Sequence, residues 1–303
     1  MHKLILFLLI LIHTSDLLAN ENLKVTPNSF LANDTPNIYK AIRNKEYKKL
    51  SILLKNGEDP CQQMRYKYKH VMNTATAFDY AIRTGNVEIV KEFLPFIKNL
   101  TKPTCLDYPS LFYAALIDDV PMIQFLIQNG ANVNYVSKYG TKNSAIEEAL
   151  MHGKIKSARF LLKNGAKMSA ESQFKVLKHS VITLNIDVVK FLIKHKINLN
   201  YKDKQGNTIL HIISMGRIDK NLKSLQKFSN SKYVQKIPGY RASIIETINE
   251  LKSKWDNYPK IIQLLVKNGA NYKLKNDNGK TPYILAKENN TKEMLMFFSK
   301  NKK

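Results

Sequence analysis

The sequence predicts an all-α solenoid of about seven helix-pair repeats, with projecting loops and one helical insertion. An apolar helical stretch that ends in Asn-Gly recurs at residues 53–57, 126–130, 161–165 and 265–269. Gly130 and Gly165 lie 35 residues apart, which is typical of stacked repeats. Glycine takes the left-handed backbone conformation that closes a helix, so each Asn-Gly marks a helix end. Short helix pairs of this kind are stable only when stacked.

The first two repeats follow residue 35. Thr35 and Pro36 offer a helix cap and a first-turn proline. The second helix of this repeat is predicted over residues 47–55. In the second repeat, a short helix over residues 76–85 precedes an antiparallel partner over residues 86–94.

The second repeat resembles the ankyrin repeat. Ala81, Gly85, Val90, Phe93 and Leu94 occupy the apolar and turn positions of that pattern. The resemblance continues through three more repeats, at residues 111–130, 145–165 and 174–196, and in total covers about residues 36–301. The third repeat has Asp118 where glycine is usual, and the fifth keeps the period but loses both glycines.

The sixth repeat begins at residues 203–211 with the family's turn, and Ile209 stands in place of its proline. The position of the family's alanine is occupied by Ile212 in the sixth repeat and by Ala286 in the seventh. These residues lie 74 apart, whereas consecutive repeats are normally about 33 residues apart. This surplus predicts an insertion at about residues 217–258, before a second helix over 260–266. The seventh repeat, residues 278–298, is expected to cap the stack.

The insertion itself combines a helix and a loop. An apolar stripe at helical spacing consists of Ile244, Ile245, Ile248, Leu251 and Trp255. Residues 227–233 are expected to form a loop. Trp255, which is the only tryptophan, is expected either to anchor a partner or to hold the insertion on its scaffold.

Apolar residues at the helix faces are expected to form the core between repeats. The predicted core residues are Ala81, Val90, Phe125, Leu126, Phe160, Leu161, Phe191 and Leu192. The resemblance implies that the exposed loops and first helices are free to bind a protein partner.

The N-terminus resembles an export signal. Its basic start precedes nine apolar residues at 4–12, and Ala19 offers a cleavage point. Nine residues are too few to cross a bilayer, which needs roughly 20. The predicted organisation is a signal peptide at 1–19, a linker at 20–35 and a repeat domain at 36–303. An uncleaved anchor remains an alternative if Leu17 and Leu18 extend the apolar core.

The chain is strongly basic, with 48 Lys and Arg residues against 24 Asp and Glu and a formal charge of +24. The electrostatic field of such a basic chain favours binding to acidic proteins, phosphate backbones or anionic membrane surfaces. The alternative is that many of the lysines only keep a long helical array in solution. The two cysteines, Cys61 and Cys105, follow the second helices of consecutive repeats and are candidates for a disulfide in an exported chain.

Tyrosines and lysines are interleaved in the predicted loops. We predict a basic, tyrosine-rich concave face formed by Tyr66, Tyr68, Tyr135, Lys138, Tyr139, Tyr201, Lys202, Lys204, Tyr272, Lys273 and Lys275. Tyrosine supplies contact area and a polar hydroxyl, and lysine attracts carboxylates. The alternative is that the tyrosines pack on the preceding loop while the lysines are solvated.

No motif for catalysis is present. The sequence lacks a Gly-rich phosphate loop, Gly-x-Ser-x-Gly and His-Glu-x-x-His. We therefore expect no enzymatic activity, no cofactor and no metal site. His211 stands in the family's Thr-Pro-Leu-His position, where the resemblance implies that it bonds the turn backbone.

The sequence therefore predicts a non-catalytic binding scaffold of the extracytoplasmic space, periplasmic or secreted, that holds an acidic partner protein. A periplasmic protector or antidote is one form, and a secreted effector that binds a host protein is the alternative. Binding to nucleic acid or to an anionic membrane would also use the charge, although export argues against nucleic acid.

Overall fold

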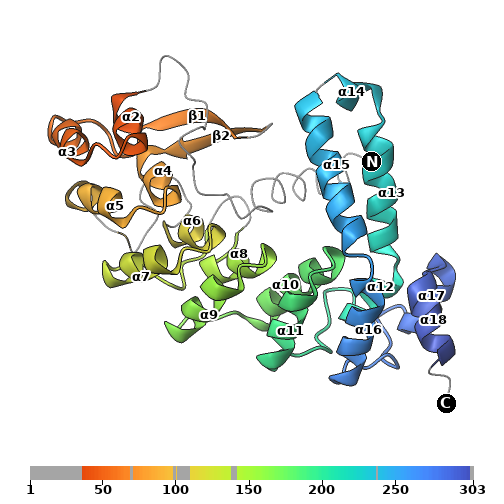
Figure 1. Cartoon of the computed structure of the whole chain (residues 1–303). Coiled ribbons are helices and arrows are strands. Elements are labelled where there is room, and N and C mark those ends of the chain that lie inside the picture. The colour runs from red at the N-terminus through yellow and green to blue at the C-terminus, as the bar shows by residue number, and fades with distance from the viewer. Residues whose placement is uncertain are drawn as a thin grey trace. The chain divides into compact units, whose positions relative to one another are not determined.

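The computed structural model describes residues 36–68, 71–97, 100, 110–137, 142–236 and 238–300 (Figure 1). Contacts divide the chain into two compact units at residues 167 and 168. We name the described residues up to 167 the N-terminal unit and those from 168 the C-terminal unit. The predicted signal peptide at 1–19 and linker at 20–35 lie outside the described residues.

The N-terminal unit is a stack of helix pairs. The pairs are α2 (Asn37–Arg43) with α3 (Tyr47–Lys55), α4 (Ala77–Arg83) with α5 (Val87–Phe93) and the 3-10 helix η1 (Leu94–Phe96), α6 (Ser110–Leu116) with α7 (Val120–Gln128), and α8 (Ala145–Met151) with α9 (Ile155–Lys163). First helices contact one another in the order α2, α4, α6 and α8, and second helices follow as α3, α5, α7 and α9. The predicted pairing of helices is confirmed.

Alanine allows the first helices of this unit to approach closely. Ala41, Ala81, Ala114 and Ala149 recur on these helices and are completely buried. Six of the eight predicted core residues are buried, including Val90, Leu126 and Leu161. Phe125 and Phe160 are only half-buried, because both lie next to the buried stripe of a helix that faces the core on one side only.

Repeats that lack glycine keep the left-handed turn between their helices. Asp118 and Leu184 both adopt a φ value of +55°, as glycine does at Gly85 and Gly153 with φ +68°. A residue with a Cβ costs roughly 1–2 kcal/mol in this conformation. The packing of the flanking helices therefore imposes the turn where the local sequence does not favour it.

A β-hairpin lies between the first and second helix pairs of the all-α stack. Strands β1 (Gln63–Tyr68) and β2 (Val71–Thr76) pair antiparallel, with Gln63 opposite Thr76 and Tyr68 opposite Val71. The hairpin replaces the loop predicted before the second repeat, and its alternating, β-favouring residues were the overlooked signal. Its base is held by the Tyr39 hydroxyl, which lies 2.7 Å from the carbonyl oxygen of Gln62, just before β1, and 2.7 Å from that of Ala75 in β2.

The C-terminal unit repeats the stack with an interruption. Its pairs are α10 (Ala170–Ile182) with α11 (Ile186–Lys194), α12 (Ile209–Ser214) with α16 (Asn257–Lys267), and α17 (Pro282–Asn289) with α18 (Lys292–Lys300). Helices α10, α12 and α17 form one row of contacts, and α11, α16 and α18 form the other. The helix that completes the sixth repeat is therefore α16, which is longer than the stretch 260–266 that the sequence predicts.

Between α12 and α16, the chain forms three helices that we name the arm: α13 (Arg217–Ser229), α14 (Lys232–Gln235) and α15 (Pro238–Ser253). The arm has its own apolar core, formed by Leu225, Val234, Ile244 and Ile248 with Leu222, Phe228 and Leu251 packed around it. The loop predicted at 227–233 is wrong, because α13 continues through Ser229 and α14 begins at Lys232. Phe228 and Val234 contribute to this core, and that burial favours helix over loop.

Trp255 lies where the arm returns to the stack. Its ring meets that of Tyr258 edge-on at 5.6 Å, and Tyr258 in α16 is completely buried. This contact joins the end of the arm to α16, and the role of Trp255 stays a prediction. Within the residues that the structure describes, no helix has the length and apolarity needed to span a bilayer.

Candidate partner-binding surface

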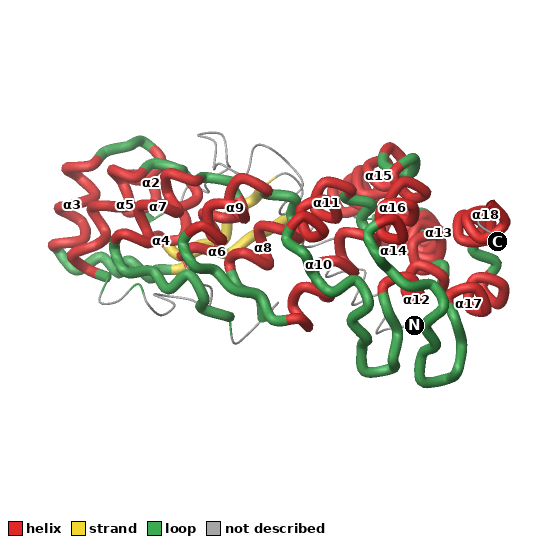
Figure 2. The backbone as a smooth tube through the Cα atoms, turned by 90° about the horizontal axis from the view of Figure 1, so that it is seen from below, coloured by secondary structure: helices red, strands yellow, loops and turns green. Residues whose placement is uncertain are grey.

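Two loops of the C-terminal unit carry most of the predicted binding residues that the structure describes. We name them finger A (residues 195–208, between α11 and α12) and finger B (residues 268–281, between α16 and α17); both project from the helices in Figure 2. The Asp203 carboxylate accepts hydrogen bonds from the backbone N–H groups of Gln205 (3.0 Å) and Asn207 (2.8 Å). In finger B, the side-chain oxygen of Asn276 accepts in the same way from Asn278 (3.1 Å) and Lys280 (3.0 Å). Each tip is thus a tight turn held by its own side chain.

Asparagine side chains join the two fingers. Asn200 donates to the Gly269 carbonyl at 2.9 Å and accepts from the Asn271 N–H at 2.7 Å. Near the tips, the Asn276 amide donates to the side-chain oxygen of Asn207 at 2.9 Å, and both residues are buried. The fingers therefore form one connected surface.

The tips approach so closely that glycine is required. A Cβ on Gly206 would overlap the Asp277 carboxylate and lie 2.7 Å from the Asp277 backbone nitrogen. That nitrogen donates to the Gln205 carbonyl at 3.3 Å. With a φ of +70°, Gly206 also adopts a conformation that other residues rarely take.

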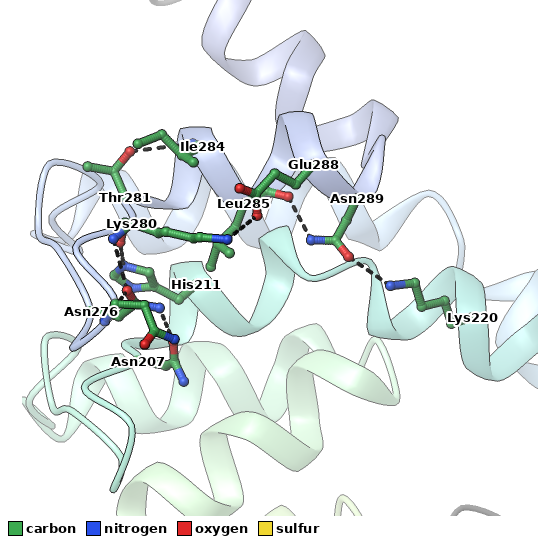
Figure 3. Close-up of polar contacts among 11 residues, drawn as sticks. Asn207, His211, Lys220, Asn276, Lys280, Thr281, Ile284, Leu285, Glu288 and Asn289 are labelled. Atoms are coloured by element: carbon green, nitrogen blue, oxygen red, sulfur yellow. Dashed lines mark hydrogen bonds and ion pairs between the residues drawn. The ribbon is translucent and has the colours of Figure 1, made fainter. Parts of the chain in front are cut away.

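His211 anchors finger B to the first helix of the sixth repeat (Figure 3). Its Nδ1 accepts from the Thr208 N–H at 3.1 Å, and its Nε2 lies 3.0 Å from the Lys280 carbonyl. The side chain is completely buried, and this burial lowers the pKa of the imidazole. A neutral ring with the proton on Nε2 satisfies both contacts. The structural role that the resemblance implies for His211 agrees with this geometry.

Each finger has two exposed lysines at alternate positions near its centre. Lys202 and Lys204 lie in finger A, and Lys273 and Lys275 lie in finger B. The Lys202 ammonium donates to the Lys275 carbonyl at 2.9 Å, across the two fingers. Lys280 differs from the other four because its ammonium pairs with Glu288 at 2.8 Å. The connected fingers therefore present a positively charged surface.

The tyrosines of the fingers contribute to packing. Tyr201 is half-buried and its ring lies 5.3 Å from that of Phe174 in α10. Tyr272 is half-buried against Phe297 (6.2 Å) and Phe298 (5.8 Å) of α18. Both rings thus contact their own repeat stack, so their role in binding a partner remains a prediction.

The remaining predicted residues belong to the N-terminal unit. Tyr135 is half-buried, beside an isolated bridge between Val136 and Ser144. Lys138 and Tyr139 lie outside the described residues, as do the side chains of Tyr66 and Tyr68, whose backbone belongs to β1. An inter-repeat bridge also occurs here, since Asn134 donates to the Gly165 carbonyl at 3.0 Å and accepts from the Lys167 N–H at 2.8 Å.

The cysteine prediction involves one described residue. Cys61 is disulfide-bonded and follows α3 in the chain. Cys105 is the only other cysteine of the sequence and lies outside the described residues. The pairing therefore stays a prediction.

Several polar residues of structural importance were not identified from the sequence. Asn200, Asn207 and Asn276 join the fingers, and only a repeated Asn pattern hinted at them. In α8, the buried Glu148 pairs with His152 at 3.2 Å, and the spacing of four residues was the available signal. No cluster of three or more potential metal ligands occurs among the described residues.

Comparison with known proteins identifies the family. The family model described as "Ankyrin repeats (3 copies)" matches residues 38–137 and again residues 78–172. The chain is an ankyrin repeat protein. The predicted family and fold are thereby confirmed, and so is the absence of enzymatic function, because ankyrin repeat domains are non-catalytic binding modules.

This ankyrin repeat protein is similar to curated ankyrin repeat proteins of several origins. It is 29% identical over 135 residues to one of Acanthamoeba polyphaga mimivirus, which covers 44% of this chain and 17% of the relative. It is 24% identical over 250 residues to one of Rickettsia felis, covering 82% of this chain and 60% of the relative. The chain thus spans less than two thirds of either relative.

Solved ankyrin repeat structures share the fold. The human ASB11 ankyrin repeat domain matches with a TM-score of 0.53 and 19% identity, over 86% of this chain and 97% of that domain. The ankyrin repeat domain of Bcl-3, a member of the IkappaB protein family, matches with a TM-score of 0.51 and 15% identity, over 88% of this chain and all of that domain. Ankyrin repeat domains are protein-binding scaffolds in general, and the family match places this chain among them.

Proposed function

We propose that fingers A and B of this scaffold hold an acidic segment of a partner protein. The observation that carries the proposal is the set of four exposed lysines on two loops that are hydrogen-bonded to each other. Exposed lysines attract carboxylates and accelerate encounter. The Asp203 carboxylate is already used by its own turn, so it competes weakly for these lysines.

The rigidity of the fingers supports binding. Asn200 and Asn276 connect the loops at their bases and tips, and His211 fixes finger B to α12. Loops that are ordered before binding lose less conformational entropy when the partner arrives. Tyr201 and Tyr272 are half-exposed beside these lysines, so part of each ring is available to a partner.

A charge-reversal experiment tests the proposal. We name the triple substitution Lys204→Glu, Lys273→Glu and Lys275→Glu the finger variant. The matched control is the helix variant, which combines Lys194→Glu, Lys260→Glu and Lys267→Glu on exposed positions of α11 and α16. Both variants change the net charge equally, so a difference in their binding affinities shows that the location of the lysines matters.

Binding of a fluorescent polyglutamate peptide, followed by anisotropy at roughly 100 mM salt, is the measurement. The finger variant should bind about tenfold more weakly or worse, because it replaces attraction by repulsion. The helix variant should stay within about twofold of the natural chain, since its lysines lie outside the fingers. Equal loss in both variants, or no loss in the finger variant, would refute the proposal.

We also propose that the chain is exported and acts outside the cytoplasm. The apolar run at residues 4–12 behind a basic start supports this location. Cell fractionation of the native chain with an antibody is the test. Retention in a periplasm favours a protector that holds a harmful partner, release favours an effector directed at a host, and an uncleaved cytoplasmic chain overturns the location.

A further inference from the structure

The arm carries a charge pattern that differs from the fingers. Five exposed lysines lie along α13 and α14, namely Lys220, Lys223 and Lys227 of α13 with Lys232 and Lys236 at α14; we name these five lysines the basic face. We propose that the basic face adsorbs to the surface of a membrane that contains anionic phospholipids.

Helical geometry places the α13 lysines together. Residues 220, 223 and 227 are spaced by three and four, which puts their side chains on one side of a helix. The opposite side of α13 contributes Leu222 and Leu225 to the arm core. The lysines therefore point away from the packed interior.

The basic face carries an excess of positive charge. Asp219 directly precedes Lys220, and the sequence has no acidic residue from 220 to 236. At the end of α15, by contrast, Glu250 forms an ion pair with Lys254. Lys220 donates to the neutral side chain of Asn289 at 2.8 Å (Figure 3). Residues 219–236 thus carry five lysines against one aspartate.

The chemistry of the basic face favours a membrane over other anionic partners. The apolar residues of α13, Leu222, Leu225 and Phe228, pack into the arm core, whereas protein interfaces use apolar and aromatic side chains as anchors for the partner. Binding of single-stranded nucleic acid uses exposed aromatic rings for stacking. Arginine recognises a single phosphate through two parallel hydrogen bonds, whereas lysine acts as a point charge that suits a diffuse layer of lipid headgroups. Each lysine near such a surface strengthens membrane binding roughly fivefold.

The arm and the fingers leave the C-terminal unit in different directions. Figure 1 shows α13 and α15 side by side along the length of the arm, and Figure 2 looks almost down its axis while the fingers project across the view. Membrane contact through the basic face therefore leaves fingers A and B accessible. The inference goes beyond the proposed function and stands if that proposal fails.

Vesicle sedimentation with the full chain tests the inference. Vesicles contain phosphatidylcholine alone or with about 30 mol% phosphatidylserine, at roughly 100 mM salt. The arm variant combines Lys223→Glu, Lys227→Glu and Lys232→Glu, and the helix and finger variants are controls of equal charge. Circular dichroism of each variant verifies that the helices are retained, and Lys→Gln substitutions at the three arm positions provide a second, milder variant.

The natural chain should bind the vesicles that contain phosphatidylserine and not the neutral ones. The arm variant should lose on the order of 100-fold in affinity, since three lysines each contribute roughly fivefold, while the helix and finger variants should stay within about threefold. Three results would overturn the inference: full binding by the arm variant, equal loss in all variants, or binding to a DNA duplex in preference to the vesicles.

Discussion

The Asp118 carboxylate accepts hydrogen bonds from both the backbone N–H and the hydroxyl of Ser157, at 2.9 and 2.8 Å. Asp118 lies in the left-handed turn after α6, and Ser157 lies in the first turn of α9, which belongs to the next repeat. The aspartate that replaces the family's glycine thus caps a neighbouring helix. The backbone cost of a side chain in this turn is offset by a bond between repeats.

Substitution of Asp118 should separate these two effects. Asp118→Ala should lower the free energy of unfolding by about 2–3 kcal/mol, because it keeps the backbone strain and loses both hydrogen bonds. Asp118→Gly should cost only about 1 kcal/mol, since glycine relieves the strain. Urea unfolding followed by circular dichroism measures both values. A glycine variant less stable than the alanine variant would show that the turn is not strained.

The buried carboxyl of Asp79 should make the protein less stable as the pH rises. Burial raises the pKa of Asp79 from 3.8 to about 6, against the opposing influence of Thr76 and Arg83. The folded state therefore binds a proton that the unfolded state releases, and stability falls between about pH 4 and pH 6. Asp79→Asn should remove this decline and raise the unfolding free energy at pH 7.5 by roughly 1–3 kcal/mol. The exposed Asp187→Asn is the control, and an equal response of both variants would contradict the prediction.

His211 should act on stability in the opposite direction. Burial lowers the pKa of its imidazole. Below about pH 6.5, the unfolded state therefore binds a proton more readily than the folded state does. Stability is complete above the unfolded pKa of about 6.5 and falls as the pH drops through that value. In an Asp79→Asn background, unfolding should require less urea at pH 5.5 than at pH 7.5. Adding His211→Gln should weaken the protein at pH 7.5 by about 2 kcal/mol and flatten this pH dependence; an unchanged slope would exclude His211 as the source.

The bond from Asn200 to finger B should protect that finger from local opening. Asn200→Ala removes the contacts with Gly269 and Asn271 and should cost about 1–2 kcal/mol. Hydrogen exchange at the Asn271 amide should become faster by about tenfold or more. Asn198→Ala is the matched control, because the Asn198 side chain accepts from the Asn200 N–H within finger A. Equal exchange rates in the two variants would show that the bridge does not hold the fingers together.

The packing of Tyr201 should contribute to the free energy of unfolding of the protein. Tyr201→Ala loses the ring contact with Phe174 in α10 and should lower the unfolding free energy by roughly 1–2 kcal/mol. Tyr201→Phe keeps the ring and should be nearly neutral. Thermal unfolding compares the variants. If Tyr201→Ala is as stable as the natural chain, the ring serves the partner rather than the scaffold.

Local patterns predicted the helices because helix formation and termination depend on neighbouring residues. The second helix of the first repeat was predicted over residues 47–55, the bounds of α3. The large separation between the two helices of the sixth repeat predicted the insertion. The finger lysines were predicted because they lie in the turns between repeats. The helical content of residues 227–233 did not follow, since Val234 and Phe228 become buried only when α15 packs against them.

By itself, the sequence determined the repeat architecture, the family and the excess of positive charge, all of which are properties of short stretches and of composition. Only the tertiary structure decided that Gly206 must accommodate Asp277, that His211 bonds the Lys280 carbonyl, and that Tyr201 meets Phe174. The two fingers are separated by the insertion of α13 to α15, so the regular spacing of the repeats does not encode their contacts. Stacking of the repeats brings these residues together, and the arrangement of the basic fingers depends on that stacking.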